Sequence, residues 1–211
     1  MKIILVANFK GGVGKSTISN LLQERLSNSV ILALDIYQDV EITNIVNDDG
    51  VCNTKLLKKG FEIDLQEYVD LGVEHIIIDM PGYMDERVLK IMRYVDLIVL
   101  PMTLGFRSTN TTALTIEELH KHNNTCKKLA VVNMHKSDKE YEECRDELEA
   151  LLDGRIEVLY TQIRLSKAIK TIEKRQVGIN VLVSEVGGHV YKPILKKFEN
   201  LASMVKKLIG E

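Results

Sequence analysis

The stretch KIILVANFKGGVGKST (residues 2–17) decides how the rest of the chain is interpreted. Residues 2–7 form a nearly continuous apolar run, which predicts a buried strand. Residues 8–17 bring three glycines and a Lys-Ser pair, and apolar residues then recur at helical spacing from Ile18 to Leu26. A strand, a glycine-rich loop, Lys-Ser and a helix, in this order, are typical of a loop that binds phosphate groups.

Each residue type in this loop has a chemical reason to be there. Glycine lets backbone N–H groups turn inward without a clash at Cβ, and the start of the following helix adds a partial positive charge. Lys15 is placed to reach the outer phosphates, and the Ser16 hydroxyl is placed to ligate Mg²⁺. We therefore expect nucleotide contacts from Gly11, Gly12, Val13, Gly14, Lys15, Ser16 and Thr17.

The composition is that of an ordinary globular protein. The 211 residues, 45% of them hydrophobic and 27% charged, predict one domain spanning 1–211. The net charge of −2 does not require a nucleic-acid partner, so any DNA contact must come from a local patch. No apolar run reaches the ~18–20 residues that span a bilayer. Three widely spaced cysteines favour neither a disulfide framework nor a metal site, so a reducing cytoplasm is expected.

Apolar runs alternate with helical patterns along the whole chain. Further strands are expected at 30–34, 74–79, 96–101, 129–134 and 156–160. Helices are expected at 65–71, 87–94, 108–122, 139–152 and 191–209, and in the third of these Ala113, Leu114, Ile116 and Leu119 are expected to face inward. This alternation predicts a doubly wound α/β fold with a mostly parallel sheet flanked by helices. His75 is expected at the surface, without a role.

Two of the predicted strands end in aspartate. Asp35 follows the second strand and Asp79 ends the third, and in a parallel sheet both lie at the edge where ligands bind. Asp79 precedes Met-Pro-Gly, which is typical of a Walker B aspartate followed by a switch glycine. We expect Ser16, Asp35 and Asp79 to serve the metal, and the Gly82 N–H to reach the γ-phosphate.

The glycine-rich loop departs from the standard phosphate-loop pattern, which places glycine where this chain has Phe9. The run from Lys10 to Thr17 instead resembles the deviant Walker A motif of the ParA/MinD family of ATPases. The resemblance covers nearly the whole chain and is strongest at 1–20, 74–101 and 155–183. It implies ATP and Mg²⁺ as ligands, and it makes Lys10 a second catalytic lysine that crosses a dimer interface, beside Lys15.

The resemblance weakens at the second strand. The family reads Asp-x-Asp-Pro-Gln where this chain has Asp35-Ile36-Tyr37-Gln38-Asp39, so tyrosine occupies the place of the aspartate that positions the attacking water. Tyrosine is a poor base at neutral pH. Two interpretations stay open: Asp39 acts as the catalytic substitute, or hydrolysis is weak or uses another group.

The end of the fifth predicted strand bears on the choice of base. Asn133 is the candidate contact to adenine. The following residues 135–138 (HKSD) meet most of the [NT]-K-x-D pattern with which GTPases recognise guanine, but His135 replaces the first residue. Asp138 is also a good N-cap for the helix at 139–152, and this interpretation favours ATP over GTP.

Basic residues gather in the last third of the chain. Arg164, Lys167, Lys170, Lys192 and Lys196 are either a solvated surface or a patch for DNA phosphates. The helix at 191–209 has a long apolar stripe, which either packs on the sheet or binds a membrane surface. Its length and its lack of tryptophan favour packing, so no membrane partner is expected.

The resemblance implies a DNA-segregation ATPase close to small plasmid-type ParA proteins. Such a protein forms a sandwich homodimer on binding ATP, binds DNA non-specifically, and hydrolyses ATP slowly until a centromere-binding ParB/ParG-like partner stimulates it. It would reside on the nucleoid in the cytoplasm. The alternatives are a MinD-like membrane-associated positioning ATPase and a metabolic enzyme on the same scaffold; a nitrogenase-iron-protein-like reductase would need paired cluster cysteines, which this sequence lacks.

Overall fold

The structure is a computed structural model of residues 1–211. It describes residues 1–34, 54–56 (backbone), 62–164, 166, 168–169, 171–172, 179–185 and 187–211. The expectations for Asp35, Tyr37, Asp39, Lys167 and Lys170 lie outside these residues.

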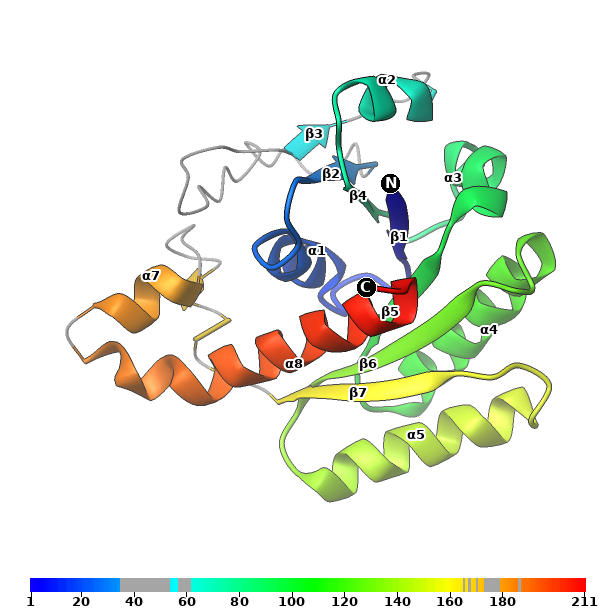
Figure 1. The fold of residues 1–211 in the computed structure, drawn as a ribbon. Helices are drawn as coiled ribbons and strands as arrows, with labels where there is room; N and C mark the ends of the chain where they lie inside the picture. The colour runs from blue at the N-terminus through cyan, green and yellow to red at the C-terminus, as the bar shows by residue number, and fades with distance from the viewer. Residues whose placement is uncertain are drawn as a thin grey trace.

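In the described part of the chain, one sheet of seven parallel strands forms the centre of the molecule (Figure 1). The strand order is β3-β2-β4-β1-β5-β6-β7. Their bounds are β1 Lys2–Val6, β2 Ser29–Ala33, β3 Thr54–Leu56, β4 His75–Asp79, β5 Leu97–Met102, β6 Lys127–His135 and β7 Leu159–Arg164. The predicted doubly wound α/β class is confirmed.

Helices cover both faces of this sheet. They are α1 Lys15–Gln23, α2 Leu65–Asp70, α3 Glu86–Ile91, α4 Phe106–His122, α5 Asp138–Leu152, α7 Ile179–Ser184 and α8 Lys192–Ile209, with short 3₁₀ turns η1 Met92–Tyr94 and η2 Gly188–Tyr191. α1 and α8 pack on one face, whereas α3, α4 and α5 pack on the other. Because the central strands are covered on both faces, they are apolar at nearly every position.

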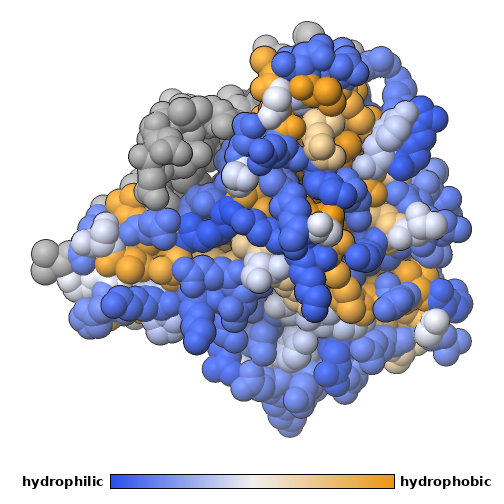
Figure 2. All heavy atoms as spheres, in the orientation of Figure 1, coloured by the Kyte–Doolittle hydropathy of each residue, from blue (hydrophilic) through white to orange (hydrophobic). Residues whose placement is uncertain are grey.

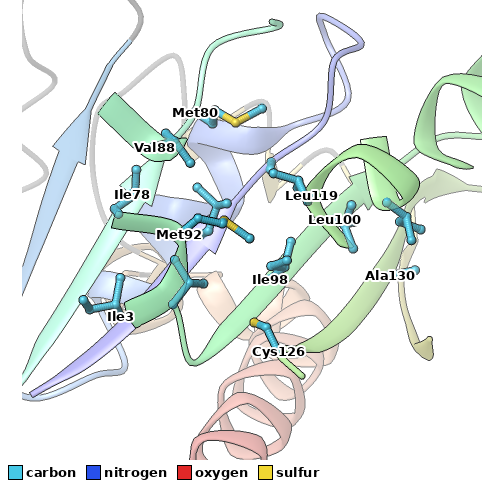
Figure 3. Packing of buried hydrophobic residues seen from close by; sticks show 14 of the residues in the cluster. Ile3, Ile78, Met80, Val88, Met92, Ile98, Leu100, Leu119, Cys126 and Ala130 are labelled. Atoms are coloured by element: carbon cyan, nitrogen blue, oxygen red, sulfur yellow. The ribbon is translucent and has the colours of Figure 1, made fainter. Parts of the chain in front are cut away.

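The core is divided between the two faces of the sheet. On the α3–α4–α5 face, Ile78, Ile98 and Leu100 pack with Met92 and Leu119, as Figure 3 shows. On the other face, inward residues of β1, β4 and β5 pack against α1 and α8. β1 and β4 are neighbours in the sheet, with Val6 in register with Asp79, so the carboxyl ends of these two strands lie side by side.

The apolar stripe of α8 packs against the sheet. Its buried residues are Ile194, Phe198, Leu201, Ala202, Val205 and Ile209. The surface seen in Figure 2 is largely hydrophilic, with scattered apolar residues. The structure therefore agrees with the packing interpretation of this helix. In the described residues, no helix is both long and apolar enough to cross a bilayer.

Two local expectations are wrong, and one short strand, β3, has no counterpart among the predicted strands. The last strand begins at Leu159 rather than at 156, because α5 ends with Asp153 and Gly154 in left-handed conformations and the chain needs further residues to reach the sheet. β3 is a three-residue edge strand, too short for a sequence pattern. His75 is buried inside β4, where its Nδ1 lies 2.8 Å from the Ser27 carbonyl oxygen and its Nε2 lies 2.9 Å from Glu211 Oε1.

Candidate nucleotide-binding site

The loop between β1 and α1 is shaped by glycines. Gly12 (φ 72°) and Gly14 (φ 96°) adopt left-handed conformations that disfavour other residues. A Cβ atom added at Gly11 or Gly12 would meet no heavy atom within 4 Å. Within the described residues, the backbone N–H groups of Gly11, Gly12 and Gly14 donate no hydrogen bond. This loop therefore offers open space lined by backbone donors, which fits the phosphate groups of a nucleotide.

Two lysines belong to this loop. The ammonium of Lys15 lies across it and donates to the carbonyl oxygens of Asn8 and Lys10, at 3.1 Å each. The Lys10 side chain is half-buried, and within the described residues its Nζ makes no hydrogen bond or ion pair. Lys15 thus lies over its own loop, while the Lys10 ammonium remains available to a second ligand.

Asn8 is a site residue that the sequence reasoning missed. Its buried amide donates to the Pro101 carbonyl oxygen (2.9 Å) and to Thr112 Oγ1 (2.8 Å). Its Oδ1 accepts from the Lys10 backbone N–H at 2.9 Å. Asn8 therefore ties the backbone of Lys10 to β5 and α4. A polar residue directly after an apolar strand was the signal available in the sequence.

Helix α4 supports the loop through hydroxyl groups. Thr115 Oγ1 accepts from the Phe9 backbone N–H at 3.1 Å, and Thr112 Oγ1 accepts from Asn8. Ser108, Thr109, Thr112 and Thr115 are all fully buried. Leu114, by contrast, is 53% exposed, so the prediction that it faces inward is wrong. The inner face of α4 mixes hydroxyl and apolar side chains because it meets a polar loop as well as the core.

Asp79 and Gly82 lie beside the loop. Asp79 is buried at the end of β4, in register with Val6 of β1 and Ala33 of β2. A Cβ atom added at Gly82 would lie 3.4 Å from the Phe9 carbonyl oxygen and 3.9 Å from the Gly11 nitrogen. The structure thus brings the segment after β4 against the loop that precedes Lys15, Ser16 and Thr17 at the start of α1.

Asn133, the residue predicted to contact adenine, lies at the end of β6 beside the glycine-rich loop. It is buried at 1% exposure, and its amide donates to the Val13 carbonyl oxygen at 3.0 Å. A Cβ atom added at Gly14 would lie 2.4 Å from Asn133 Nδ2. Asn133 therefore supports the loop from β6 through its Nδ2, while its Oδ1 has no hydrogen-bond partner among the described residues. The contact of Asn133 with adenine stays a prediction.

The residues after β6 correct the expectation that Asp138 caps the following helix. Ser137, not Asp138, is the N-cap of α5: its hydroxyl accepts from the Glu140 backbone N–H at 3.2 Å. Asp138 lies in the first turn and forms a 2.6 Å ion pair with Arg164 at the end of β7. This pairing lowers the pKa of the Asp138 carboxyl. The cap argument that favoured ATP over GTP therefore no longer holds for Asp138.

The basic residues do not gather as one described patch. Arg164 is engaged by Asp138, whereas Lys192 and Lys196 are exposed on α8. No group of three or more His, Cys, Asp or Glu side chains in the described part of the chain could hold a metal ion. A magnesium ion here would use few protein ligands beside phosphate oxygens and water, which is its usual coordination in nucleotide sites.

Comparison with known families now identifies the chain. The model of the CobQ/CobB/MinD/ParA nucleotide binding domain matches residues 4–179. The chain belongs to this family. The match spans the glycine-rich loop, Asp79, Gly82 and Asn133, so nucleotide binding is the property expected of the site described above. A search of curated proteins finds no match.

Solved structures share the fold of this ParA/MinD family member at low identity. An ATP complex of a McdA variant from Cyanothece has a TM-score of 0.63 at 16% identity, covering 100% of this chain and 96% of the other. MinD with Mg-ADP from Pyrococcus horikoshii has a TM-score of 0.63 at 17% identity, covering 99% and 97%. A plasmid partition protein from Borrelia burgdorferi has a TM-score of 0.53 at 18% identity, covering 88% and 99%.

Proposed function

We propose that this chain is a ParA-like ATPase that acts in DNA segregation. The observation that carries the proposal is the loop after β1, where open backbone N–H groups meet two lysines with different partners. Lys15 lies on its own loop, whereas the Lys10 ammonium has no partner among the described residues. The family match and the three structural relatives support a nucleotide as the ligand.

Residues 11–17 would bind the phosphates through backbone N–H groups, the Lys15 ammonium and the start of α1. Ser16 would ligate Mg²⁺ directly and Asp79 would hold it through water, together with Asp35. When bound, this ion would neutralise phosphate charge. Gly82 lies against the loop, so its N–H would donate a hydrogen bond to the γ-phosphate when ATP is bound and would lose this partner after hydrolysis.

The proposed working form is a dimer closed by ATP. Lys10 of each subunit would reach the nucleotide of its partner, and Asn8 and Thr112 would hold the Lys10 backbone in place for that contact. The γ-phosphate would be the contact that differs between the two states, which is what a nucleotide switch requires. Hydrolysis would be slow, with Asp39 or another group orienting water, and stimulated by a centromere-binding ParB/ParG-like protein.

DNA would bind this dimer through exposed lysines of α8. Lys192 and Lys196 are exposed and spaced four residues apart, so they lie on one side of the helix. Lys167 and Lys170 would extend the patch. Arg164 would contribute less, because Asp138 already occupies its guanidinium. Such contacts to phosphates carry no sequence preference.

The test measures the oligomeric state by light scattering with AMPPNP, with ADP and without nucleotide. We expect dimers only with AMPPNP, and monomers for Lys10→Ala under all three conditions. Lys139→Ala removes a lysine whose side chain is 85% exposed and serves as the matched control. A wild-type protein that binds AMPPNP yet stays monomeric would contradict the dimer mechanism.

Two further measurements separate the parts of this proposal. Retention of DNA should require ATP and should fall in a Lys192→Ala/Lys196→Ala double variant that still dimerises. Equal retention with ATP, ADP and no nucleotide would exclude a DNA switch. Competition of labelled ATP by unlabelled GTP decides the base, and efficient competition would identify a GTP-binding protein instead.

A further inference from the structure

A pocket with several charged side chains lies at the opposite edge of the sheet from the glycine-rich loop. It has a volume of about 250 Å³ and is formed where β6 and β7 begin, beside the ends of α4 and α8. We call it the amino-edge pocket, because parallel strands all start at this edge; Figure 1 shows the C-terminal end of α8 approaching the sheet there. Its charged and polar lining includes His120, Lys127, Lys128, Arg155 and Glu157.

Lys128 is the unusual residue of this pocket. It is only 3% exposed, and its ammonium makes one hydrogen bond, to the Cys126 carbonyl oxygen at 2.6 Å. No carboxylate of the described residues forms an ion pair with it. Burial lowers the pKa of this ammonium, as expected for a buried cation without a counter-ion. A lysine ammonium has three donors, so most of its hydrogen-bonding capacity is unused.

Other basic side chains line the same pocket and have partners of their own. Lys127 donates to the Leu208 carbonyl oxygen at 2.9 Å, and Arg155 donates to Glu117 and to carbonyl oxygens at the end of α5. His120 lines the same pocket, and its buried Nδ1 has no hydrogen-bond partner in the described structure. Burial, together with the charge of Lys128, lowers the pKa of His120, so this imidazole adds no positive charge near neutral pH.

Negative charge in the pocket is limited. Among the described lining residues Glu157 is the one carboxylate, against Lys127, Lys128 and Arg155, and Glu117 outside the lining pairs with Arg155. Burial raises the pKa of the Cys126 thiol to about 11, so the thiol stays neutral. Asp96 lies close enough to influence Cys126, but it is bound by the Lys2 ammonium at 3.2 Å and by the Ile3 N–H. The pocket therefore carries a net positive charge around a buried, incompletely satisfied ammonium.

We propose that the amino-edge pocket binds a small oxyanion, a phosphate or carboxylate group, with Lys128 as its central ligand. Such an anion would supply the acceptors and the counter-charge that Lys128 lacks, and the unpartnered His120 nitrogen would become a second donor on protonation. The pocket is smaller than the ~300–1,000 Å³ typical of drug-sized ligands, which favours a small anion. The site is independent of the proposed ATPase function, because it lies at the other edge of the sheet.

The test titrates sodium phosphate and, separately, sodium acetate into protein saturated with Mg-ADP, so that the glycine-rich loop does not respond. Sodium chloride at equal ionic strength is the reference. The ¹³Cε signal of Lys128, assigned through Lys128→Arg, should shift saturably. A response to phosphate alone identifies a phosphate site, a response to acetate alone identifies a carboxylate site, and a response to both identifies a general oxyanion site.

Thermal unfolding provides the second measurement. The effective anion should raise the Tm of the wild type and of Lys139→Met, because ligands that bind only the folded state stabilise it. Lys128→Met keeps the length of the side chain and removes its charge. The affinity for the anion, fitted from the rise of Tm with anion concentration, should be lower by ~10-fold or more in this variant. Equal responses of Lys128→Met and wild type, or a Lys128 signal that follows ionic strength alone, would overturn the proposal. If the protein does not bind Mg-ADP, the titrations use Lys15→Ala in place of the Mg-ADP complex. The oxyanion proposal can then be tested even if the proposed ATPase function fails.

Discussion

The loop after β1 and the loop after β6 lie at the same edge of the sheet, but they differ in whether their backbone N–H groups are hydrogen-bonded within the protein. In the first loop, Gly11, Gly12 and Gly14 leave their N–H groups without a hydrogen bond among the described residues. In the second, the chain satisfies itself: Ser137 Oγ accepts from the Glu140 N–H, and Glu140 Oε2 accepts from the Lys136 N–H at 2.6 Å. The first loop is built for a ligand, whereas the second is a closed helix start.

From this difference we predict which substitutions should affect nucleotide binding and which should affect stability. Side chains around the first loop, such as Asn8 and Thr115, hold its backbone in shape without using its glycine donors. Around the second loop, the side chains of Ser137 and Glu140 use the donors directly. Changes in the first loop should weaken nucleotide binding, and changes in the second should lower the free energy of unfolding alone.

The largest effect is expected from Lys15→Ala. Loss of the ammonium that lies over the loop removes charge-assisted hydrogen bonds to phosphate, so nucleotide affinity should fall by roughly 100-fold, or ~3 kcal/mol. Calorimetric titration with ATP measures this change, with Lys139→Ala as the control. An unchanged affinity would place the nucleotide elsewhere on the chain.

Gly14→Ala comes next, because it acts on the shape of the first loop. The residue has φ 96°, and the new Cβ would lie 2.4 Å from Asn133 Nδ2, so the free energy of unfolding should fall by about 2–3 kcal/mol. Gly72 also has a positive φ, of 69°, but a Cβ there would meet open space. Gly72→Ala should therefore lower the free energy of unfolding by only ~1–2 kcal/mol. Chemical denaturation of both variants, and of Gly14→Ala/Asn133→Ala, separates backbone strain from the close contact.

Ser137→Ala tests the second loop. Loss of the N-cap should reduce the free energy of unfolding by ~1 kcal/mol, while nucleotide affinity stays at the wild-type value. Asp138→Ala serves as the comparison, and it should be the less destabilising change, because Asp138 lies in the first turn rather than at the cap. If Asp138→Ala were the more damaging change, the assignment of the cap to Ser137 would be wrong.

The smallest effect is expected from Arg164→Gln. The guanidinium lowers the pKa of the Asp138 carboxyl, so the variant should return that pKa toward its ordinary value, as NMR titration would show. The sign follows from linkage: a depressed carboxyl pKa contributes stability above its unfolded value, and this contribution is lost as the pH falls through the folded value. Both side chains are largely exposed, so the change in stability should be small. A pKa unchanged in Arg164→Gln would mean that the ion pair does not form in solution.

Much of the fold could be predicted from short-range patterns, and the errors share one cause. The strands at the centre were found because burial on both faces makes them continuously apolar, as in β1 and β4. The errors at His75, Leu114 and the start of β7 all concern polar or peripheral positions, where the neighbours across space decide the outcome. His75 is buried because Ser27 and Glu211, distant in sequence, supply acceptors for its ring nitrogens.

The sequence by itself determined the glycine-rich loop, its two lysines and the order of strands and helices, because these depend on spacing along the chain and on the conformational freedom of glycine. The tertiary structure alone decided that Asn8 and α4 hold this loop, that Asn133 supports it from β6, and that Ser137 caps α5. It also decided that Lys128 is buried without a counter-ion among the residues that the structure describes. The physical reason is that hydrogen bonds and charge compensation depend on which groups lie close together in space, and a local sequence pattern does not contain this information.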